Sequence, residues 1–195
     1  MDKLREYLKT KFTFSDEEIE KMETCFTPER IGKSDFFLKE GQYCKSVAFV
    51  EKGSFVYFDL LDGEEKICDF AFENDWITQY QSLLKSTPAE TNIQASENAL
   101  ILKMDMEKIE ELSASIPKIT EMRAALAEEY FTETAKRASQ LANLQAEERY
   151  NILMEEKPEI NQRIPQYQIA SYLGVKPQSL SRIRSQNRAK EIKKK

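Results

Sequence analysis

The sequence predicts an α+β protein in which an antiparallel β-sandwich is followed by a long helix and then by several short helices. Short β-type runs separated by tight turns occupy residues 28–104, a helical pattern continues from Ser115 to about Gln145, and three shorter helical segments follow. The chain has 195 residues and 41% of them are apolar, which is enough for a large core.

The first 24 residues are expected to form helices. MDKLREYLKTKF is charged, helix-like and without a secretory pattern. SDEEIEKMET begins with Ser15 and carries Glu18 three residues later, which is the arrangement of a capping box. No apolar run approaches the roughly 18 residues of a membrane helix. These features predict a cytoplasmic protein with no membrane partner.

The strands of the sandwich are predicted from alternating apolar residues. DFFLKEGQ is expected to be a strand that ends at Gly41, and residues 46–72 alternate around two breaks, Lys52-Gly53 and Asp62-Gly63. An Asp-Gly pair between apolar runs is a strong signal for a two-residue hairpin. Further strands are expected at about 90–96 and 98–104, before a helix at 105–112. Short strands joined by tight turns are typical of a jelly-roll sandwich or a barrel.

The helix expected at 115–145 is longer than a small domain needs, since some thirty residues span about 45 Å. Its apolar residues recur every three, four or seven positions: Ile116, Ile119, Met122, Leu126, Tyr130, Phe131, Leu141 and Leu144. Two interpretations stay open. The helix packs along its own sandwich, or it pairs with a second copy in the manner of a coiled coil to form a homodimer.

The segment IPQYQIASYLGVKPQSLSRIRSQ has the layout of a helix-turn-helix, with helices at 166–173 and 177–187. Another helix is expected before it, at 146–156. Gly174 permits the positive φ of a tight turn, and Val175 is expected to pack into the core beneath it. The inner faces of the two helices are predicted to be formed by Ile169, Ala170, Leu173, Leu180 and Ile183.

The other side of the second helix carries residues suited to DNA. Arg can pair with guanine and Gln with adenine in the major groove, and hydroxyl groups near a helix start suit phosphates. A generic αα-hairpin has the same apolar spacing, but residues 161–195 hold nine lysines and arginines against one acid. This net charge of +8, with −13 on residues 1–160, favours double-stranded DNA as the partner. The candidate DNA-binding residues are Lys176, Gln178, Ser179, Ser181, Arg182, Arg184 and Arg188.

Histidine is absent, and the three cysteines, Cys25, Cys44 and Cys68, are far apart. The commonest general base and metal ligand is therefore missing, and no clustered spacing for zinc or an iron–sulfur cluster exists. We expect no enzyme, no metal and no cofactor, because a jelly-roll enzyme such as a cupin would need histidine ligands. The cysteines are interpreted as reduced and mostly buried thiols, with a redox-sensing thiol as the alternative. Trp76 is interpreted as a core residue rather than a base-stacking one.

These segments resemble the cyclic-AMP receptor/FNR superfamily of bacterial transcription regulators over nearly the whole chain. IASYLGVKPQSLSRIR is the most specific part, and FFLKEGQYCKSVAFVEKGSFVYF is similar to the early strands of the family's sandwich. The resemblance implies a cyclic-nucleotide-binding-like sensor domain at 1–114, a dimerisation helix at 115–145 and a DNA-binding domain at 146–195. It also implies that Gln178, Ser179 and Arg182 meet DNA, with Arg182 at a base edge.

The resemblance also locates the cassette that holds the cyclic phosphate in nucleotide-binding relatives. Thr78 and Gln79 stand where those relatives have Gly-Glu, and Ala89 and Glu90 stand where they have Arg-Ser. Thr134 lines up with the position that meets the purine. With no arginine in this cassette, we expect a degenerate effector pocket that does not bind cyclic AMP. An effector, if one exists, has an unidentified chemistry, and RNA polymerase is a further candidate partner.

The family's helix-turn-helix is usually followed by a β-hairpin wing, whereas this sequence closes with RAKEIKKK. The wing is therefore expected to be truncated, and the lysines either contact phosphates in its place or form a solvated end. The function predicted from the sequence is a homodimeric transcription regulator on a two-fold-related DNA site. The alternative is a ligand-binding signalling module whose helical tail docks a protein.

Overall fold

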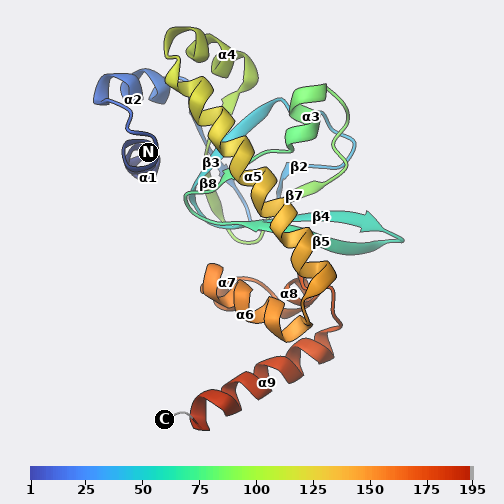
Figure 1. Cartoon of the computed structure of the whole chain (residues 1–195). Coiled ribbons are helices and arrows are strands. Elements are labelled where there is room, and N and C mark those ends of the chain that lie inside the picture. Colours follow the sequence, from blue (N-terminus) through green and yellow to red (C-terminus); the bar gives the residue numbers. More distant parts are fainter. Residues whose placement is uncertain (194–195) are drawn as a thin grey trace. The chain divides into compact units, whose positions relative to one another are not determined.

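The computed structural model describes residues 1–193 (Figure 1). Its elements in chain order are α1 (Asp2–Phe12), α2 (Asp16–Glu23), β1 (Thr27–Ile31), β2 (Phe36–Leu38), β3 (Ser46–Lys52), β4 (Phe55–Leu61), β5 (Glu64–Ala71), β6 (Trp76–Ile77), α3 (Tyr80–Lys85), β7 (Asn92–Ala95), β8 (Ala99–Asp105), α4 (Met106–Ser115), α5 (Lys118–Asn143), α6 (Ala146–Glu156), α7 (Ile160–Arg163), α8 (Gln166–Tyr172) and α9 (Pro177–Lys193). The predicted α+β fold class is confirmed.

The described chain divides into two compact units. The first consists of Met1–Leu60 and Cys68–Glu129, and the second consists of Leu61–Ile67 and the chain from Tyr130 onward. The division falls within α5 and within the β4–β5 hairpin, so each of these elements contributes residues to both units. No helix in residues 1–193 is long and apolar enough to cross a membrane.

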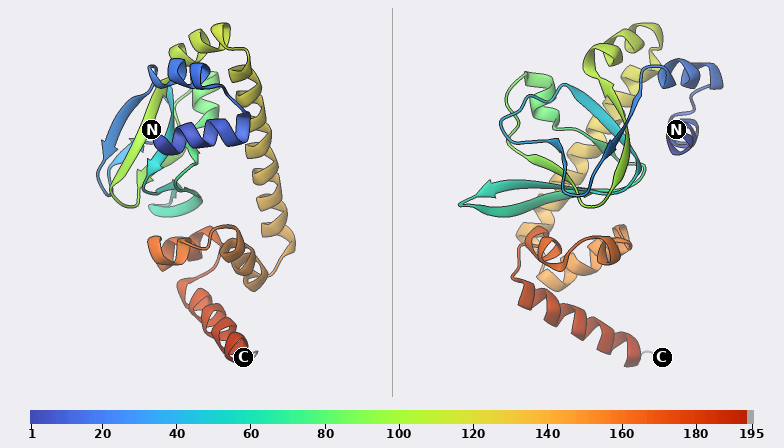
Figure 2. Two further views of the ribbon diagram at one scale, coloured as in Figure 1. Left: turned by 90° about the vertical axis from the view of Figure 1, so that its left-hand side faces the viewer. Right: turned by 180° about the vertical axis from the view of Figure 1, so that it is seen from behind.

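The first unit is built around two four-stranded sheets, with the strand orders β1-β8-β3-β6 and β2-β7-β4-β5. Figure 2 shows these strands from two further sides. The turn between β3 and β4 requires glycine, because Gly53 has φ +106° and a Cβ there would lie 2.6 Å from the Cβ of Ala99. Asp62 and Gly63 both have positive φ and form the two-residue turn between β4 and β5. Both predicted breaks are confirmed.

Some predicted boundaries were wrong. β2 ends at Leu38 rather than continuing to Gly41, since Gly41 has φ +82° and donates its N–H to Ala89 O at 2.8 Å, so that the chain turns away. The long helix begins at Lys118, because α4 continues to Ser115 and Pro117 has no N–H with which to extend it. The final helix continues to Lys193 rather than ending near residue 187, and the last two lysines of the predicted tail lie outside the described residues. The short helices α3 and α7 were not predicted.

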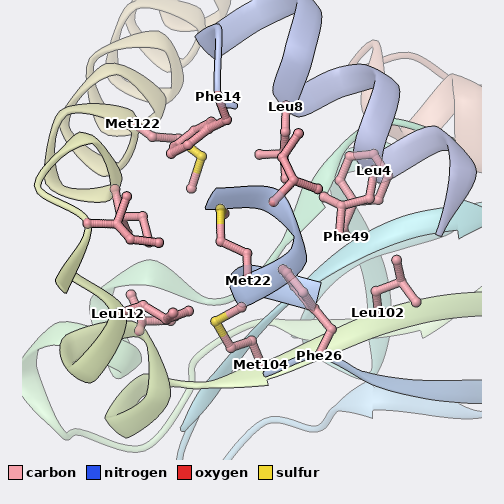
Figure 3. Packing of buried hydrophobic residues seen from close by; sticks show 14 residues of the cluster. Leu4, Leu8, Phe14, Met22, Phe26, Phe49, Leu102, Met104, Leu112 and Met122 are labelled. Atoms are coloured by element: carbon pink, nitrogen blue, oxygen red, sulfur yellow. The ribbon is translucent and has the colours of Figure 1, made fainter. Parts of the chain in front are cut away.

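Two apolar clusters stabilise the first unit. One lies between the two sheets and includes Phe55, Ile77 and Ile93. The other packs α1, α2, α4 and the start of α5 against the sandwich, as Figure 3 shows for Leu4, Leu8, Phe14, Met22, Phe26, Phe49, Leu102, Met104, Leu112 and Met122. Trp76 packs against this second cluster, with its ring centre 5.3 Å from that of Phe49. Trp76 is thus half-buried and packs on the core, in agreement with its interpretation as a packing residue.

The first part of α5 is held by its own chain. Ile119 and Met122 are buried in the second cluster, the Lys118 ammonium lies 3.1 Å from a carboxylate oxygen of Glu18, and Lys11 pairs with Glu129 at 2.6 Å. From Tyr130 onward the apolar residues of α5 emerge into solvent: Tyr130 is 58% exposed, Phe131 74% and Leu141 44%. The helix therefore packs on its own chain over its first turns and presents large apolar side chains over its remainder.

Local predictions at the N-terminus and for the cysteines agree with the structure. Ser15 and Glu18 form the predicted capping box, with Glu18 N donating to Ser15 Oγ at 3.2 Å and Ser15 N donating to the Glu18 carboxylate at 2.8 Å. None of the three cysteines forms a disulfide in the described part of the chain. Cys44 is buried, as predicted, whereas Cys25 and Cys68 are only half-buried.

Candidate nucleic-acid interface

The helix-turn-helix consists of α8, a tight turn and α9 (Figure 1). Gly174 has φ +67°, and the N–H groups of Gly174 and Val175 donate to Ser171 O and Ala170 O, each at 3.0 Å. These are the two hydrogen bonds of a Schellman motif, which ends a helix at a residue in the left-handed region. Pro177 then begins α9, where its missing N–H leaves no helical hydrogen bond unmade. The positive φ predicted for Gly174 is confirmed.

The two helices pack through the residues predicted for their inner faces. Each of these side chains is less than one-tenth exposed: Ile169, Ala170, Leu173, Leu180 and Ile183. Val175 is only half-buried, so it packs less deeply than the sequence predicted. Because Leu180 and Ile183 fix the buried side of α9, they also decide which of its side chains face solvent.

The exposed side of α9 carries most of the predicted DNA-binding residues. Those that are exposed are Lys176, Gln178, Ser179, Ser181, Arg182 and Arg188. With about 100° of rotation per residue, Gln178, Arg182 and Ser185 lie within about 60° of one another, on the side opposite Leu180. Gln178, Arg182, Ser185 and Gln186 are named here the recognition face.

Two members of the recognition face were not predicted from the sequence. Ser185 and Gln186 are exposed, and Ser185 Oγ donates to Ser181 O at 3.0 Å within the helix. Ser185 lies seven residues after Gln178, and two helical turns bring residues at that spacing to one face. This spacing in the sequence would have identified Ser185.

Arg184 has a different environment from the recognition face. It is half-buried and, with Asn187 and Arg188, lines a hollow of about 430 Å³ whose other walls include Tyr150 and Asn151 of α6. Asn187 Nδ2 donates to Asn151 Oδ1 at 2.6 Å and ties α9 to α6. The structure therefore separates the predicted residues into a recognition face with its flanks and a pair of arginines beside α6.

The chemistry of the recognition face matches the edges of base pairs. An arginine guanidinium can donate two hydrogen bonds to guanine, and a glutamine amide can pair with adenine. Lys176 and Ser179 lie beside the start of α9, where the helix dipole favours phosphate oxygens. The described residues contain no group of three or more Asp, Glu or Cys side chains that could hold a metal ion.

The predicted effector cassette is occupied by internal contacts of the sandwich. Thr78 Oγ1 donates to Ser46 O at 3.1 Å, and the side-chain oxygen of Gln79 accepts from Ser82 N at 2.6 Å to cap α3. The hydroxyl of Ser82 in turn accepts from Cys44 N at 2.9 Å. Both cassette residues therefore hold the loop and α3 in place.

The later half of the cassette offers no cation. Ala89 is 2% exposed and belongs to the apolar cluster between the sheets, whereas Glu90 points into solvent. Thr134 is exposed on α5 and belongs to the second unit. At the position that the sequence analysis aligned with an arginine of nucleotide-binding relatives, this chain has the buried methyl group of Ala89.

The fold and the candidate site define a class of protein, an antiparallel β-sandwich followed by a long helix and a helix-turn-helix. Residues 28–115 match the family model described as the cyclic nucleotide-binding domain. No curated protein sequence matches the chain significantly. The matched segment is the part of the chain that contains nearly all residues of the strands β1 to β8.

Solved structures share the fold of nearly the whole chain. FixK2 from Bradyrhizobium japonicum has a TM-score of 0.74 at 18% identity, with 86% of each chain covered. The regulator CLP from Xanthomonas campestris, described as responsive to c-di-GMP, has a TM-score of 0.72 at 16% identity, with 91% of this chain and 93% of that chain covered. A regulator assigned to the Crp/Fnr family from Eubacterium rectale has a TM-score of 0.69 at 14% identity, with coverages of 95% and 88%. The resemblance predicted from the sequence is confirmed at the level of the fold.

Proposed function

We propose that this protein is a DNA-binding transcription regulator that acts through the recognition face of α9. The observation that carries the proposal is the arrangement of Gln178 and Arg182 on one exposed side of a helix whose other side is buried against α8. Such a helix fits the major groove and leaves its polar side chains free to pair with bases. The regulator acts without catalysis, and RNA polymerase is its downstream partner in this proposal.

The regulator acts as a homodimer in this proposal. Tyr130 and Phe131 are more than half exposed, side by side on α5, and Leu141 is exposed further along the same helix. Large apolar side chains gathered on one helix are typical of a surface that a second helix covers. Pairing of two α5 helices would give a two-fold axis, and two recognition faces would then read a two-fold-related DNA site.

The sandwich of this regulator does not take cyclic AMP in our proposal. A cyclic phosphate held away from water needs a paired cation or several donors. Ala89 is buried among apolar side chains, Glu90 is an acid, and Thr78 and Gln79 already have internal partners. An effector of this domain would therefore have a chemistry other than that of a cyclic nucleotide.

Selection of bound sequences from a random DNA pool tests the proposal. We expect enrichment of a sequence with two related half-sites whose centres lie about 34 Å apart, and binding that weakens as salt rises. If no sequence is enriched and binding to DNA is absent at low salt, the helix-turn-helix does not serve DNA recognition. The alternative, a signalling module whose helical tail docks a protein, would then take its place.

A further inference from the structure

The hollow of about 430 Å³ beside Arg184 lies between α6, α7 and the second half of α9. All three helices belong to the second unit, so the hollow forms within one compact part of the chain. Sites for small molecules commonly measure about 300 to 1,000 Å³. The hollow is therefore large enough for a metabolite, and it is named here the α6–α9 hollow.

The α6–α9 hollow lies on the side of α9 that faces away from the recognition face. Arg184 follows Arg182 by two residues, and two steps of about 100° place their side chains about 160° apart around the helix. On the same side as Arg184, Asn187 Nδ2 donates to Asn151 Oδ1 of α6 at 2.6 Å. A molecule bound in the hollow would therefore not cover Gln178 or Arg182.

Two arginines of α9 line the hollow. Arg184 is half-buried, and Arg188 lies one helical turn later on the same side of the helix. Within the described part of the chain, neither guanidinium has an ion-pair partner. Guanidinium groups donate paired hydrogen bonds to carboxylate and phosphate oxygens. This wall of the hollow is therefore suited to an oxyanion.

The wall formed by α6 and α7 offers a different set of polar groups. Asn151 and Glu155 are exposed side chains one turn apart on α6. Asn161 of α7 donates from Nδ2 to Tyr150 OH at 3.3 Å, whereas its Oδ1 is buried and has no hydrogen-bond partner among the described residues. Buried polar atoms without a partner are rare and call for an explanation such as a water or a ligand. Amides and a carboxylate together accept and donate hydrogen bonds, as hydroxyl groups require.

We propose that the α6–α9 hollow binds a sugar phosphate, with its phosphate at the two arginines and its hydroxyl groups at the wall formed by α6 and α7. The charged residues that line the hollow are Arg184, Arg188 and Glu155. A ligand that is anionic at both ends would place one anion beside Glu155, which opposes binding. A neutral polyol would leave both guanidinium groups without an anion. A ligand with one anionic end and one hydroxylated end fits both walls.

The bound sugar phosphate would join α6 and α7 to the second half of α9. Leu180 and Ile183, which are buried against the rest of the helix-turn-helix, lie in the first half of α9. Beyond Ile183, the hydrogen bond between Asn187 and Asn151 connects α9 with α6. The ligand would add bonds across the same space, and a ligand that binds only the folded chain raises its stability.

Calorimetric titration of the full chain with glucose 6-phosphate, fructose 6-phosphate and ribose 5-phosphate tests the proposal. Inorganic phosphate and glucose each supply one half of the ligand. Arg184→Gln removes a guanidinium from the hollow, and Arg188→Gln does so at an exposed position, where the fold does not depend on the side chain. Arg182→Gln is the matched control, because it removes the same charge from the opposite side of the same helix. Circular dichroism checks that each variant is folded.

We expect at least one of the three sugar phosphates to bind at least about tenfold more tightly than inorganic phosphate or glucose, because it contacts both walls. Arg184→Gln and Arg188→Gln should each weaken this binding at least about tenfold, since each loses a charge-assisted hydrogen bond. Arg182→Gln should stay within about twofold of the wild type, because screening in salt leaves little effect of a charge on the far side of the helix. In amide NMR spectra, the ligand should shift signals of α6, α7 and α9 rather than signals of residues 78–90.

Four results would overturn the proposal. They are the absence of saturable binding by all three sugar phosphates, equally tight binding of inorganic phosphate, an equal loss in Arg182→Gln and Arg184→Gln, and NMR shifts confined to the sandwich.

These measurements use no DNA, so their outcome does not depend on the proposed function. If the chain binds a sugar phosphate in the hollow but binds no DNA, the site is real and the proposed function is wrong. If duplexes of any sequence displace the sugar phosphate, Arg184 and Arg188 bind DNA phosphates instead. The proposed site would then be wrong, while the proposed function would stand.

Discussion

The guanidinium of Arg137 lies 3.8 Å from the ring centre of Tyr172 and donates to the carbonyl of the same residue at 3.3 Å. One arginine from the long helix thus recognises both the side chain and the backbone at the end of α8. A planar guanidinium can stack and donate at the same time, which an ammonium group on a flexible stem cannot do equally well. This pair attaches the helix-turn-helix to α5.

Arg137→Lys should lower the free energy of unfolding of the second unit by about 1–2 kcal/mol, because the stacking and the shared hydrogen bonds are lost while the charge is kept. Urea denaturation followed by circular dichroism measures the change. Arg123→Lys, elsewhere on α5, is the control and should stay within about 0.5 kcal/mol. Equal stability of the two variants would show that the contact with Tyr172 contributes nothing.

Arg182→Ala should cost about 1–3 kcal/mol of specific DNA binding and relax the preference at one position of each half-site, because it removes the base contact that we propose. Competition binding with single-base variants of the selected duplex measures both effects. Lys108→Ala removes an exposed positive charge on α4 of the first unit and should leave the preference unchanged. A uniform loss over all sequences would instead assign Arg182 to phosphate binding.

Tyr130→Asp should convert the proposed dimer into a monomer, since a charge buried without a partner in a helix pair costs about 3–5 kcal/mol. Sedimentation equilibrium at micromolar concentration measures the association. Tyr43→Asp is the matched control, because Tyr43 is a similarly exposed tyrosine, at 55% against 58%, in the first unit. A wild-type chain that sediments as a monomer would contradict the proposed dimer.

Cyclic AMP and cyclic GMP should give no heat of binding in calorimetry and no change in DNA affinity. The reason is that the cassette presents the buried Ala89 and the acid Glu90 where an anion would need a cation. Micromolar binding linked to a gain in DNA affinity would mean that other groups hold the phosphate.

Stability towards acid should depend on Glu18. The hydrogen bond from Ser15 N and the nearby ammonium of Lys118 hold the pKa of this carboxyl below its ordinary value of 4.5. As the pH falls, the unfolded chain therefore takes up a proton on Glu18 before the folded chain does. The contribution of Glu18 to the free energy of unfolding is complete above about pH 5, and it is lost as the pH falls through the lowered pKa of the folded state. Urea midpoints across about pH 3 to 6 should fall less steeply for Glu18→Gln than for the wild type. Parallel curves for the two proteins would contradict the assigned role of Glu18.

Local signals in the sequence predicted much of the fold and the exposed position of Arg182 in the candidate site. The Asp62-Gly63 turn, the Ser15 capping box and the Gly174 turn each depend on backbone preferences within a few residues, and such preferences can be read directly from the chain. Arg182 could be identified as outward-facing because Leu180 and Ile183 mark the opposite side of the same helix. The short elements α3 and α7 lacked a periodic pattern and were missed.

By itself, the sequence determined the order of sandwich, long helix and helix-turn-helix, because apolar periodicity is local. Only the tertiary structure decided that Arg184 faces α6, that Ala89 lies in the core, and that Ser171 and Arg137 bind the edge of β5. Each of these contacts joins residues far apart in the chain, and Ser171 lies 104 positions from Ile67. A hydroxyl or a guanidinium has many equally good partners along a sequence. Its actual partner depends on the fold, because the packed elements decide which backbone groups lie nearby and lack a hydrogen bond of their own.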